Sequence, residues 1–280
     1  MIQDIFPHVF HNDFEIKTPG EDSCFLYFQD GRILLDHADS QKLPLFAALK
    51  DSKEEALAHC DYLFSIDRMD FFLVDETCVS LKESGTLTFH ETGVIRDLTP
   101  MWISFAAASA CQLHRFYKSN RFCGCCGSPM MKSKKERAVV CSSCGNTVYP
   151  KIAPAVIVAV IHEGKLLLTK YAGREYTRFA LVAGYTEFGE TLEETVKREV
   201  MEEVGLRVKN IRYYKNQPWA FSDSILVGFW AELDGSPQIR LDETELSTAV
   251  WTAPEDISDD YTNLSLTHEM ILLFKNGKVT

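Results

Sequence analysis

The sequence lacks any apolar run long enough to cross a bilayer. The better candidates, Phe105 to Leu113 and Ala155 to Ile161, are too short, and the first contains Ser109 and Gln112. The N-terminus has neither the basic n-region nor the long apolar h-region of a secretion signal. No internal repeat or low-complexity tract is visible. We therefore expect no membrane or export role.

The sequence also has no excess of basic residues. The chain has 29 Lys and Arg against 40 Asp and Glu, a net charge of −11. This balance argues against broad, sequence-independent nucleic-acid binding, but it leaves room for a small anionic ligand held by a local pocket and a metal. With 280 residues, 46% hydrophobic and 11% aromatic, the chain has room for about two domains with sizeable cores.

The nine cysteines are the first positive signal. Without a secretion signal they favour a reducing compartment, so we expect a cytoplasmic protein that uses cysteine to bind metal. Two C-x2-C pairs stand fourteen residues apart, and a glycine follows each. Four thiolates at this spacing predict one closed, tetrahedral, structural Zn²⁺ site, with Cys123, Cys126, Cys141 and Cys144 as ligands.

The other cysteines do not fit this pattern. Cys125 lies off the spacing and is interpreted as a bystander, while Cys24, Cys60, Cys78 and Cys111 are isolated and are expected to be buried thiols. A redox C-x-x-C motif would leave the matched pairs unexplained. Zinc ribbons often bind nucleic acid, but the basic run from Lys132 to Arg137 is modest, so a spacer that supports the next domain is the preferred interpretation.

The first 115 residues predict a mixed α/β domain. Short apolar runs predict strands at 25–28, 33–35, 62–64 and 71–74, with Asp30 and Gly31 turning the first into the second. Helices are expected from Gln41 to His59 and from Met101 to Tyr117, the latter with Trp102, Phe105 and Leu113 in the core.

The stretch from Gly184 to Leu206 predicts a loop and then a helix. Gly184 and Gly189 allow a tight loop, and Thr191 with Glu194 forms a capping box. A valine and leucine stripe recurs every four residues, at Leu192, Val196, Val200 and Val204, and Gly205 falls where a left-handed cap ends a helix.

Glu199, Glu202 and Glu203 share one side of this helix. Such like-charge neighbours cost an isolated helix roughly 0.2–0.5 kcal/mol per pair. Hard divalent cations prefer carboxylate oxygens and would relieve the repulsion. A solvated acidic face is the ordinary explanation of a Glu-rich helix, but here the spacing is far more specific than a charge run.

The spacing matches the box of the Nudix hydrolase family, which this stretch resembles at every fixed position: Gly184, Glu190, Arg198, Glu199, Val200, Glu202, Glu203, Gly205 and Leu206. The resemblance implies an α/β/α sandwich. Expected strands at 155–161, 165–170, 179–183, 211–214 and 225–233 and a helix at 264–274 agree with it. The predicted class is α/β (α+β), with a mixed α/β domain at 1–117, a four-cysteine zinc ribbon at 118–150 and the Nudix domain at 151–280.

Downstream, the stretch from Asn216 to Ser224 resembles the S-Q-P-W-P-F-P-x-S signature of the NADH pyrophosphatase subfamily. Gln217, Pro218, Trp219, Phe221 and Ser224 match, whereas Asn216, Ala220 and Ser222 depart. The order of N-terminal domain, ribbon and Nudix domain extends the resemblance over essentially the whole chain. It implies substrate contacts at Glu136, Tyr149, Tyr185, Gln217, Pro218, Trp219, Ala220, Phe221, Ser222, Asp223, Ser224 and Thr267.

The same resemblance implies the catalytic set. Two or three Mg²⁺ or Mn²⁺ ions would be held by Glu199, Glu202, Glu203, Glu245 and the carbonyl of Ala183. Either Glu202 or Glu203 would orient or deprotonate the attacking water. Arg198 is interpreted as an orienter of these carboxylates, and Glu190 as a residue that fixes the loop.

The predicted activity is hydrolysis of the pyrophosphate of NAD(H) to AMP and nicotinamide mononucleotide. Removal of an NAD cap from the 5′ end of RNA, or hydrolysis of ADP-ribose or another nucleoside diphosphate derivative, stays open as an alternative. A non-enzymatic binding protein is disfavoured because every box carboxylate and the arginine are present. Only the family resemblance suggests a homodimer.

Overall fold

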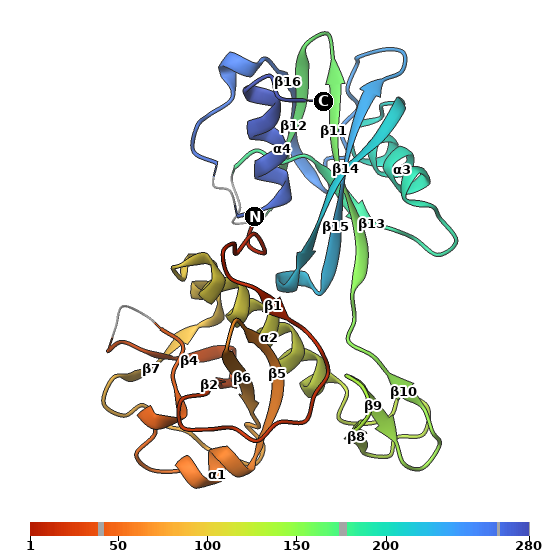
Figure 1. Ribbon diagram of the computed structural model, residues 1–280. Coiled ribbons are helices and arrows are strands. Elements are labelled where there is room, and N and C mark those ends of the chain that lie inside the picture. The colour runs from red at the N-terminus through yellow and green to blue at the C-terminus, as the bar shows by residue number, and fades with distance from the viewer. Residues whose placement is uncertain (39–41, 174–177, 262–263, 280) are drawn as a thin grey trace. The chain divides into compact units, whose positions relative to one another are not determined.

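The computed structural model describes residues 1–38, 42–173, 178–261 and 264–279 (Figure 1). The chain divides into two compact units, one of residues 2–151 and one of residue 1 with residues 152–280. Each unit is described by itself. The three-domain division expected from the sequence stays a prediction. No helix in the described part of the chain is both long and apolar enough to span a membrane.

The first unit begins with two small sheets. One has the strand order β1-β5-β6-β2 and the other β3-β4-β7. The strands expected at 33–35, 62–64 and 71–74 are confirmed, whereas the one expected at 25–28 is divided at Tyr27 into β2 and β3, which belong to different sheets. Asp30 and Gly31 form the turn between β3 and β4 with φ of 50° and 78°. The strands are β1 (Phe10–His11), β2 (Cys24–Leu26), β3 (Phe28–Gln29), β4 (Arg32–Asp36), β5 (Cys60–Ile66), β6 (Met69–Val74) and β7 (Leu87–Glu91).

The helix predicted from Gln41 to His59 forms only in part, and Gln41 itself lies outside the described residues. Only a 3-10 turn, η1 (Phe46–Ala48), and the short α1 (Lys53–Ala58) form. Pro44 and Phe46 are instead tied to the strand β2 region, because Phe25 N donates to Pro44 O and Phe46 N to Ser23 O. Ser52, whose φ is 62°, then interrupts the helical backbone conformation directly before α1.

The second expected helix is confirmed as α2 (Met101–Ser119), which follows the 3-10 turn η2 (Thr92–Asp97). Phe105 and Leu113 are buried, and Trp102 is half-buried. Of the isolated cysteines, Cys24 and Cys111 are buried as predicted, Cys60 is half-buried, and Cys78 is exposed. The prediction for Cys78 is wrong because it follows a surface turn in which Thr77 N donates to Asp75 Oδ1 at 2.9 Å.

The unit ends in an antiparallel ribbon of three strands in the order β10-β9-β8. These are β8 (Met130–Lys132), β9 (Val139–Cys141) and β10 (Thr147–Val148). The two C-x2-C pairs lie in the turns of this ribbon, and the glycines after them, Gly127 and Gly145, have φ of 74° and 75°. The left-handed conformation confirms that the backbone turns at both glycines.

The second unit is built on one mixed sheet in the order β14-β15-β11-β12-β16, with β13 paired to β11. Strand β11 runs parallel to β15 from the pair Ala153 and Ser224 to the pair Ile161 and Glu232. The elements are β11 (Ala153–His162), β12 (Lys165–Tyr171), β13 (Val182–Tyr185), α3 (Leu192–Val204), β14 (Val208–Trp219), η3 (Ala220–Ser222), β15 (Ser224–Leu233), β16 (Leu246–Thr252), η4 (Pro254–Asp256) and α4 (Leu266–Lys275).

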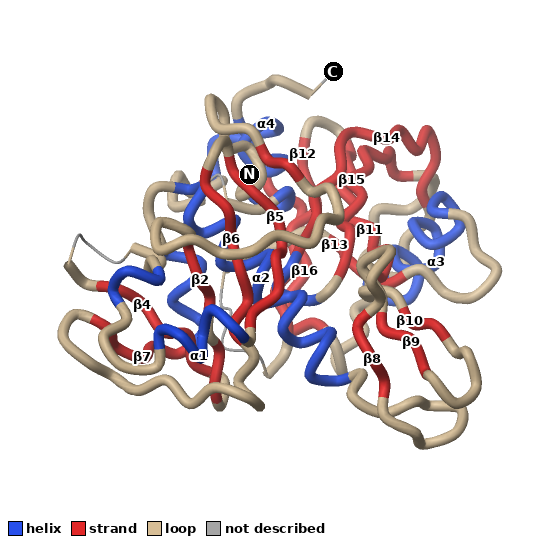
Figure 2. The backbone as a smooth tube through the Cα atoms, turned by 60° about the horizontal axis from the view of Figure 1, so that its bottom comes forward, coloured by secondary structure: helices blue, strands red, loops and turns tan. Residues whose placement is uncertain are grey.

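Alternate residues of β11 face two different cores. Val156, Val158 and Val160 pack in a cluster with the valines of α3. Ile157 and Ala159 belong to the opposite cluster with Met270 and Phe274 of α4. The sheet therefore lies between two helices, which confirms the expected α/β/α sandwich, and Figure 2 shows β11, β13 and β15 side by side within it.

Three strands of this sheet differ from the expectation. The strand expected at 211–214 extends over the whole of β14, and β16 was not predicted. The third strand begins at Val182 instead of Phe179, and Ala180 makes only an isolated bridge with Thr169. Gly184 consequently lies inside β13, paired with Val156, and the chain leaves the strand after Tyr185.

Candidate active site

Helix α3 is fixed at both ends by the residues that the sequence indicated. Thr191 N donates to Glu194 Oε2 at 2.8 Å, and Glu194 N donates to Thr191 Oγ1 at 3.2 Å, which completes the capping box. Gly205 ends the helix with φ of 67°. Val196, Val200 and Val204 are fully buried against the sheet. The rotation of the helix about its axis is thereby set, and with it the direction of the glutamate face.

The glutamates of this face differ in burial. Glu203 is 2% exposed and Glu199 is 8% exposed. Glu202 and Glu245 are exposed. Burial raises the pKa of Glu199, and Arg198 acts against this shift.

Glu199 lies directly against the backbone of β13. A Cβ placed on Gly184 would lie 2.0 Å from Glu199 Cδ, closer than any side chain permits. The tight-loop explanation of this glycine is therefore wrong for Gly184, which is in extended conformation, and holds for Gly189, with φ of 84°. Gly184 is needed because the Glu199 carboxylate occupies the space of a side chain.

Arg198 joins the loop and the helix. Its Nε donates to Glu190 Oε1 at 2.6 Å, and its Nη1 donates to Glu199 Oε1 at 2.7 Å and Glu202 Oε2 at 2.9 Å. Its Nη2 donates to Glu190 Oε2 and to the Tyr185 carbonyl, both at 2.9 Å. These contacts agree with the interpretation of Arg198 as an orienter of carboxylates.

Glu190 holds the loop between β13 and α3. Its Oε2 accepts hydrogen bonds from Glu187 N and from Thr195 Oγ1, each at 3.0 Å. The pairing with Arg198 lowers the pKa of Glu190 to about 2. Thr195, buried beneath this carboxylate, is a contact that the sequence pattern did not indicate, because threonine inside a helix has no single characteristic role.

The signature stretch forms the turn of the β14–β15 hairpin. Gln217 is fully buried: its Nε2 donates to Leu264 O at 3.0 Å, and its Oε1 accepts from Leu266 N at 2.7 Å. Trp219 and Phe221 meet edge to face, with ring centroids 4.9 Å apart. Ser222 and Ser224 are joined through their hydroxyls. The amide of Gln217 thus fixes the start of α4, where Thr267 lies half-buried.

The remaining predicted substrate contacts are accessible. Tyr185 is exposed beyond the end of β13. In the first unit, Tyr149 donates from its hydroxyl to Glu136 Oε1 at 3.1 Å, so the structure brings this predicted pair together. Pro218 is exposed, and Ala220 and Asp223 are half-buried. Their contacts with substrate stay predictions.

The four ribbon cysteines converge as a metal site requires. Their sulfur atoms all lie within 4.8 Å of one another, with Cys123 and Cys144 at 3.6 Å and Cys126 and Cys141 at 3.5 Å. The backbone N–H groups of Cys125 and Cys126 lower the pKa of Cys123 to about 6, which favours the thiolate that zinc binds. Cys125 is exposed and outside the cluster. The set fits one structural Zn²⁺ ion.

Two known domain families match adjacent segments of this chain. Residues 118–149 match the NADH pyrophosphatase zinc ribbon domain, and residues 151–271 match the NUDIX domain. The chain thus carries a Nudix domain directly after a zinc ribbon of the NADH pyrophosphatase type.

Individual relatives are similar to part of the chain. The proteins named NAD-capped RNA hydrolase NudC from Salmonella typhi and Salmonella heidelberg (strain SL476) are each 42% identical to it over 170 residues, which is 60% of this chain. The match spans 66% of the length of these curated relatives. Among solved structures, a NUDIX hydrolase from Nitrosomonas europaea gives a TM-score of 0.48 at 21% identity, covering 56% of this chain and 91% of that one.

Proposed function

We propose that this protein hydrolyses the pyrophosphate bond of NAD(H), giving AMP and nicotinamide mononucleotide. The observation that carries the proposal is the carboxylate face of α3: Glu199 lies against Gly184, and Arg198 joins it to Glu190 and Glu202. This constellation belongs to a Nudix domain that follows a zinc ribbon of the NADH pyrophosphatase type.

The acidic face suits divalent cations. One guanidinium contacts three carboxylates, that of Glu190 in the loop and those of Glu199 and Glu202 on α3, and the buried Glu203 adds a fourth carboxylate on this helix. Hard cations with oxygen ligands relieve such an excess of negative charge. Mg²⁺ or Mn²⁺ ions would be held by Glu199, Glu202, Glu203, Glu245 and the Ala183 carbonyl. When bound, such ions stabilise charge on phosphate oxygens and lower the pKa of a coordinated water.

The protein residues have separate roles in this proposal. Glu202, exposed on the face, or Glu203, buried beside it, accepts the proton of the attacking water. Arg198 keeps Glu199 and Glu202 in place and does not contact phosphate, because its donors are already engaged. Trp219, Phe221 and Tyr185 offer ring faces to the base or the nicotinamide.

A second candidate is removal of an NAD cap from RNA. It would use the same carboxylates on the same bond, with an RNA chain attached to the adenosine. The name of the relatives, NAD-capped RNA hydrolase, favours it. ADP-ribose and other nucleoside diphosphate derivatives are further alternatives, which the signature stretch from Gln217 to Ser224 disfavours.

The decisive experiment compares kcat/KM for NADH, NAD⁺, ADP-ribose and a 5′-NAD RNA under one metal condition. We expect the NAD-containing substrates to be preferred over ADP-ribose. Faster turnover of ADP-ribose than of either dinucleotide would contradict the proposal. The same preparation, assayed with Mg²⁺ and then with Mn²⁺, identifies the preferred ion.

The assembly and location of the protein are also proposed. We infer a homodimer in the cytoplasm, supported by the family resemblance and by nine cysteines that form no disulfide among the described residues. Light scattering of the purified chain tests the dimer directly.

A further inference from the structure

The segment from Lys118 to Lys151 carries a charge opposite to that of the rest of the chain. It contains seven Lys and Arg against a single acidic residue, Glu136, and therefore has a net charge of +6. Since the whole chain carries −11, all other residues together carry −17. Such local concentration of positive charge is a mark of surfaces that bind nucleic acid.

Three of these cations are already engaged within the unit. Lys118 pairs with Glu76 at 2.8 Å, and Lys132 pairs with Asp61 and with Asp75. Arg137 donates to Asn12 and to the Leu63 carbonyl, so its role is to hold the ribbon.

The other four cations are exposed. In the part of the chain that the structure describes, the side chains of Arg121, Lys134, Lys135 and Lys151 form no ion pair with an acidic residue. Two lie in the turn between β8 and β9, and two flank the ribbon. These positive charges are therefore available to an anionic partner.

Exposed aromatic rings lie among the available cations. Phe122, next to Arg121, is 65% exposed, and Tyr149, two residues before Lys151, is 56% exposed. Alternation of cations with accessible rings is what single-stranded nucleic acid needs, because phosphates meet the charges and bases stack on the rings.

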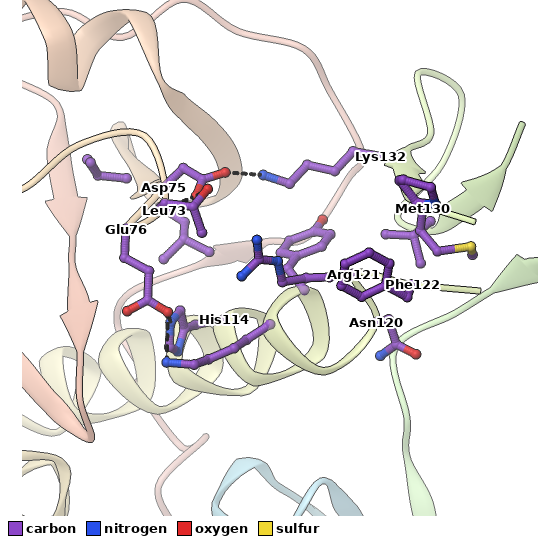
Figure 3. A pocket seen from close by; sticks show the side chains of 15 residues that line it. Leu73, Asp75, Glu76, His114, Asn120, Arg121, Phe122, Met130 and Lys132 are labelled. Atoms are coloured by element: carbon purple, nitrogen blue, oxygen red, sulfur yellow. Dashed lines mark hydrogen bonds and ion pairs between the residues drawn. The ribbon is translucent and has the colours of Figure 1, made fainter. Parts of the chain in front are cut away.

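A pocket of about 430 Å³ lies where Arg121 and Phe122 face the end of β6 and helix α2 (Figure 3). Its two acids are neutralised locally, Asp75 by Lys132 and Glu76 by Lys118. Arg121 is the cation left over. One guanidinium beside one accessible ring suits a single unstacked nucleotide, with its phosphate on Arg121 and its base on Phe122.

We propose that the exposed residues Arg121, Phe122, Lys134 and Lys135 of the ribbon segment, here termed the ribbon surface, bind the single-stranded RNA of an NAD-capped substrate. The inference rests on the proposed function for its biological substrate. It also revises the spacer interpretation of the ribbon. The acidic remainder of the chain repels RNA, which confines it to the ribbon surface and explains how an acidic protein handles a polyanion.

The test uses the zinc-loaded full chain and the double variant Lys134→Gln/Lys135→Gln. With a single-stranded 5′-NAD RNA, kcat/KM should fall about tenfold at moderate salt, and the slope of log(kcat/KM) against log[salt] should become shallower by about 1.4, since two phosphate contacts are lost. With NADH, kcat/KM should change less than about twofold, because NADH carries no RNA chain. The variant Arg121→Gln should show the same selectivity.

A matched control removes two exposed lysines of the same unit away from the ribbon, Lys50→Gln/Lys82→Gln. Three results would each overturn the proposal: an equal fall of kcat/KM for NADH and for the RNA, an unchanged kcat/KM for the RNA, or an equal fall for the RNA in the control variant.

If the protein hydrolyses neither substrate, the proposed function fails. Fluorescence anisotropy with unmodified single-stranded RNA then tests RNA binding by the ribbon surface on its own. An RNA affinity that falls about tenfold in the Lys134→Gln/Lys135→Gln variant but not in the control variant supports the proposal. Equal RNA affinity of the variant and the unaltered protein, or no RNA binding by the unaltered protein, overturns it.

Discussion

The two helices that cover the Nudix sheet are held in opposite ways. Helix α3 buries three valines against one face, and its polar residues bond mainly to one another and to the preceding loop. Helix α4 buries Met270, Ile271 and Phe274 against the other face. Its start is held by the side chain of Gln217, which bonds to backbone atoms of Leu264 and Leu266.

This difference separates chemistry from support. On α3, carboxylates are brought together at a cost in electrostatic repulsion that Arg198 offsets only in part, an arrangement typical of a site that serves a ligand. On α4, a buried amide satisfies the free backbone groups of a helix start, an arrangement that serves folding. Substitutions on α3 should therefore reduce activity, and substitutions at the α4 anchor should reduce stability.

The largest effect is expected from Glu203→Gln. The change keeps the shape of the buried side chain and removes its charge, so kcat/KM for NADH should fall about 10²- to 10⁴-fold. The melting temperature should stay close to that of the unaltered protein. Glu193→Gln, an exposed position on the same helix, is the control. Unchanged metal-dependent hydrolysis in Glu203→Gln would revive the non-enzymatic alternative.

Gly184→Ala should be nearly as damaging. Its methyl group would overlap the Glu199 carboxylate, which must move by an ångström or more, and a misplacement of about 1 Å can lower the rate about 10²-fold. Steady-state kinetics with NADH measures the loss. Gly93→Ala is the matched control, because its new methyl group would meet no atom within 4 Å. Full activity of Gly184→Ala would show that Glu199 does not need its present position.

Gln217→Ala should act on stability. It leaves the backbone groups of Leu264 and Leu266 without their partner, which should lower the free energy of unfolding by about 1–3 kcal/mol. Tryptophan fluorescence during urea unfolding reports this unit well, because three of the four tryptophans lie in it.

The activity of Gln217→Ala shows whether Gln217 contacts substrate or only supports α4. If Gln217 contacts substrate, as the family resemblance implies, kcat/KM of the folded variant should fall sharply; if it serves only α4, the change should stay within about fivefold. Asn216→Ala, at the exposed neighbouring position, is the control for both measurements.

The smallest expected effect is on the pH dependence of the melting temperature. Pairing with Arg198 lowers the pKa of Glu190 from 4.5 to about 2 in the folded protein. A carboxylate with a lowered folded pKa stabilises the fold above its unfolded pKa and loses that contribution as pH falls. The difference in melting temperature between the unaltered protein and Glu190→Gln should thus be constant above pH 4.5 and shrink between pH 4.5 and 2. A difference that grows on acidification would contradict this assignment.

Local patterns in the sequence predicted the parts of the fold that local physics determines. The stripe of Val196, Val200 and Val204, the Thr191 capping box and the Gly205 cap depend on residues within one or two helical turns, and all are confirmed. The zinc ligands are equally local, since each pair lies in one tight turn. For such features, the spacing of residues in the sequence is enough to predict the local geometry.

Other features depend on distant partners and could not be predicted in this way. The role of Gly184 arises from Glu199, fifteen residues later and on another element. The segment after Pro44 has helix-favouring composition, yet its backbone pairs with the region around Ser23. The inward direction of Gln217 depends on α4, almost fifty residues away. These tertiary contacts cannot be predicted from composition and spacing alone.

The position of β11 has a consequence for biosynthesis. This central strand pairs with β13 and, along nearly its whole length, with β15, which begins about seventy residues later in the chain. Its apolar residues therefore lack their main partner until residues up to 233 have been synthesised, and such long-range pairing is slow. The ribbon, whose strand pairs lie within about twenty residues, can close first. On the ribosome, the ribbon segment is complete while β11 still exposes the edge that β15 will cover, and such an exposed strand edge is prone to aggregation.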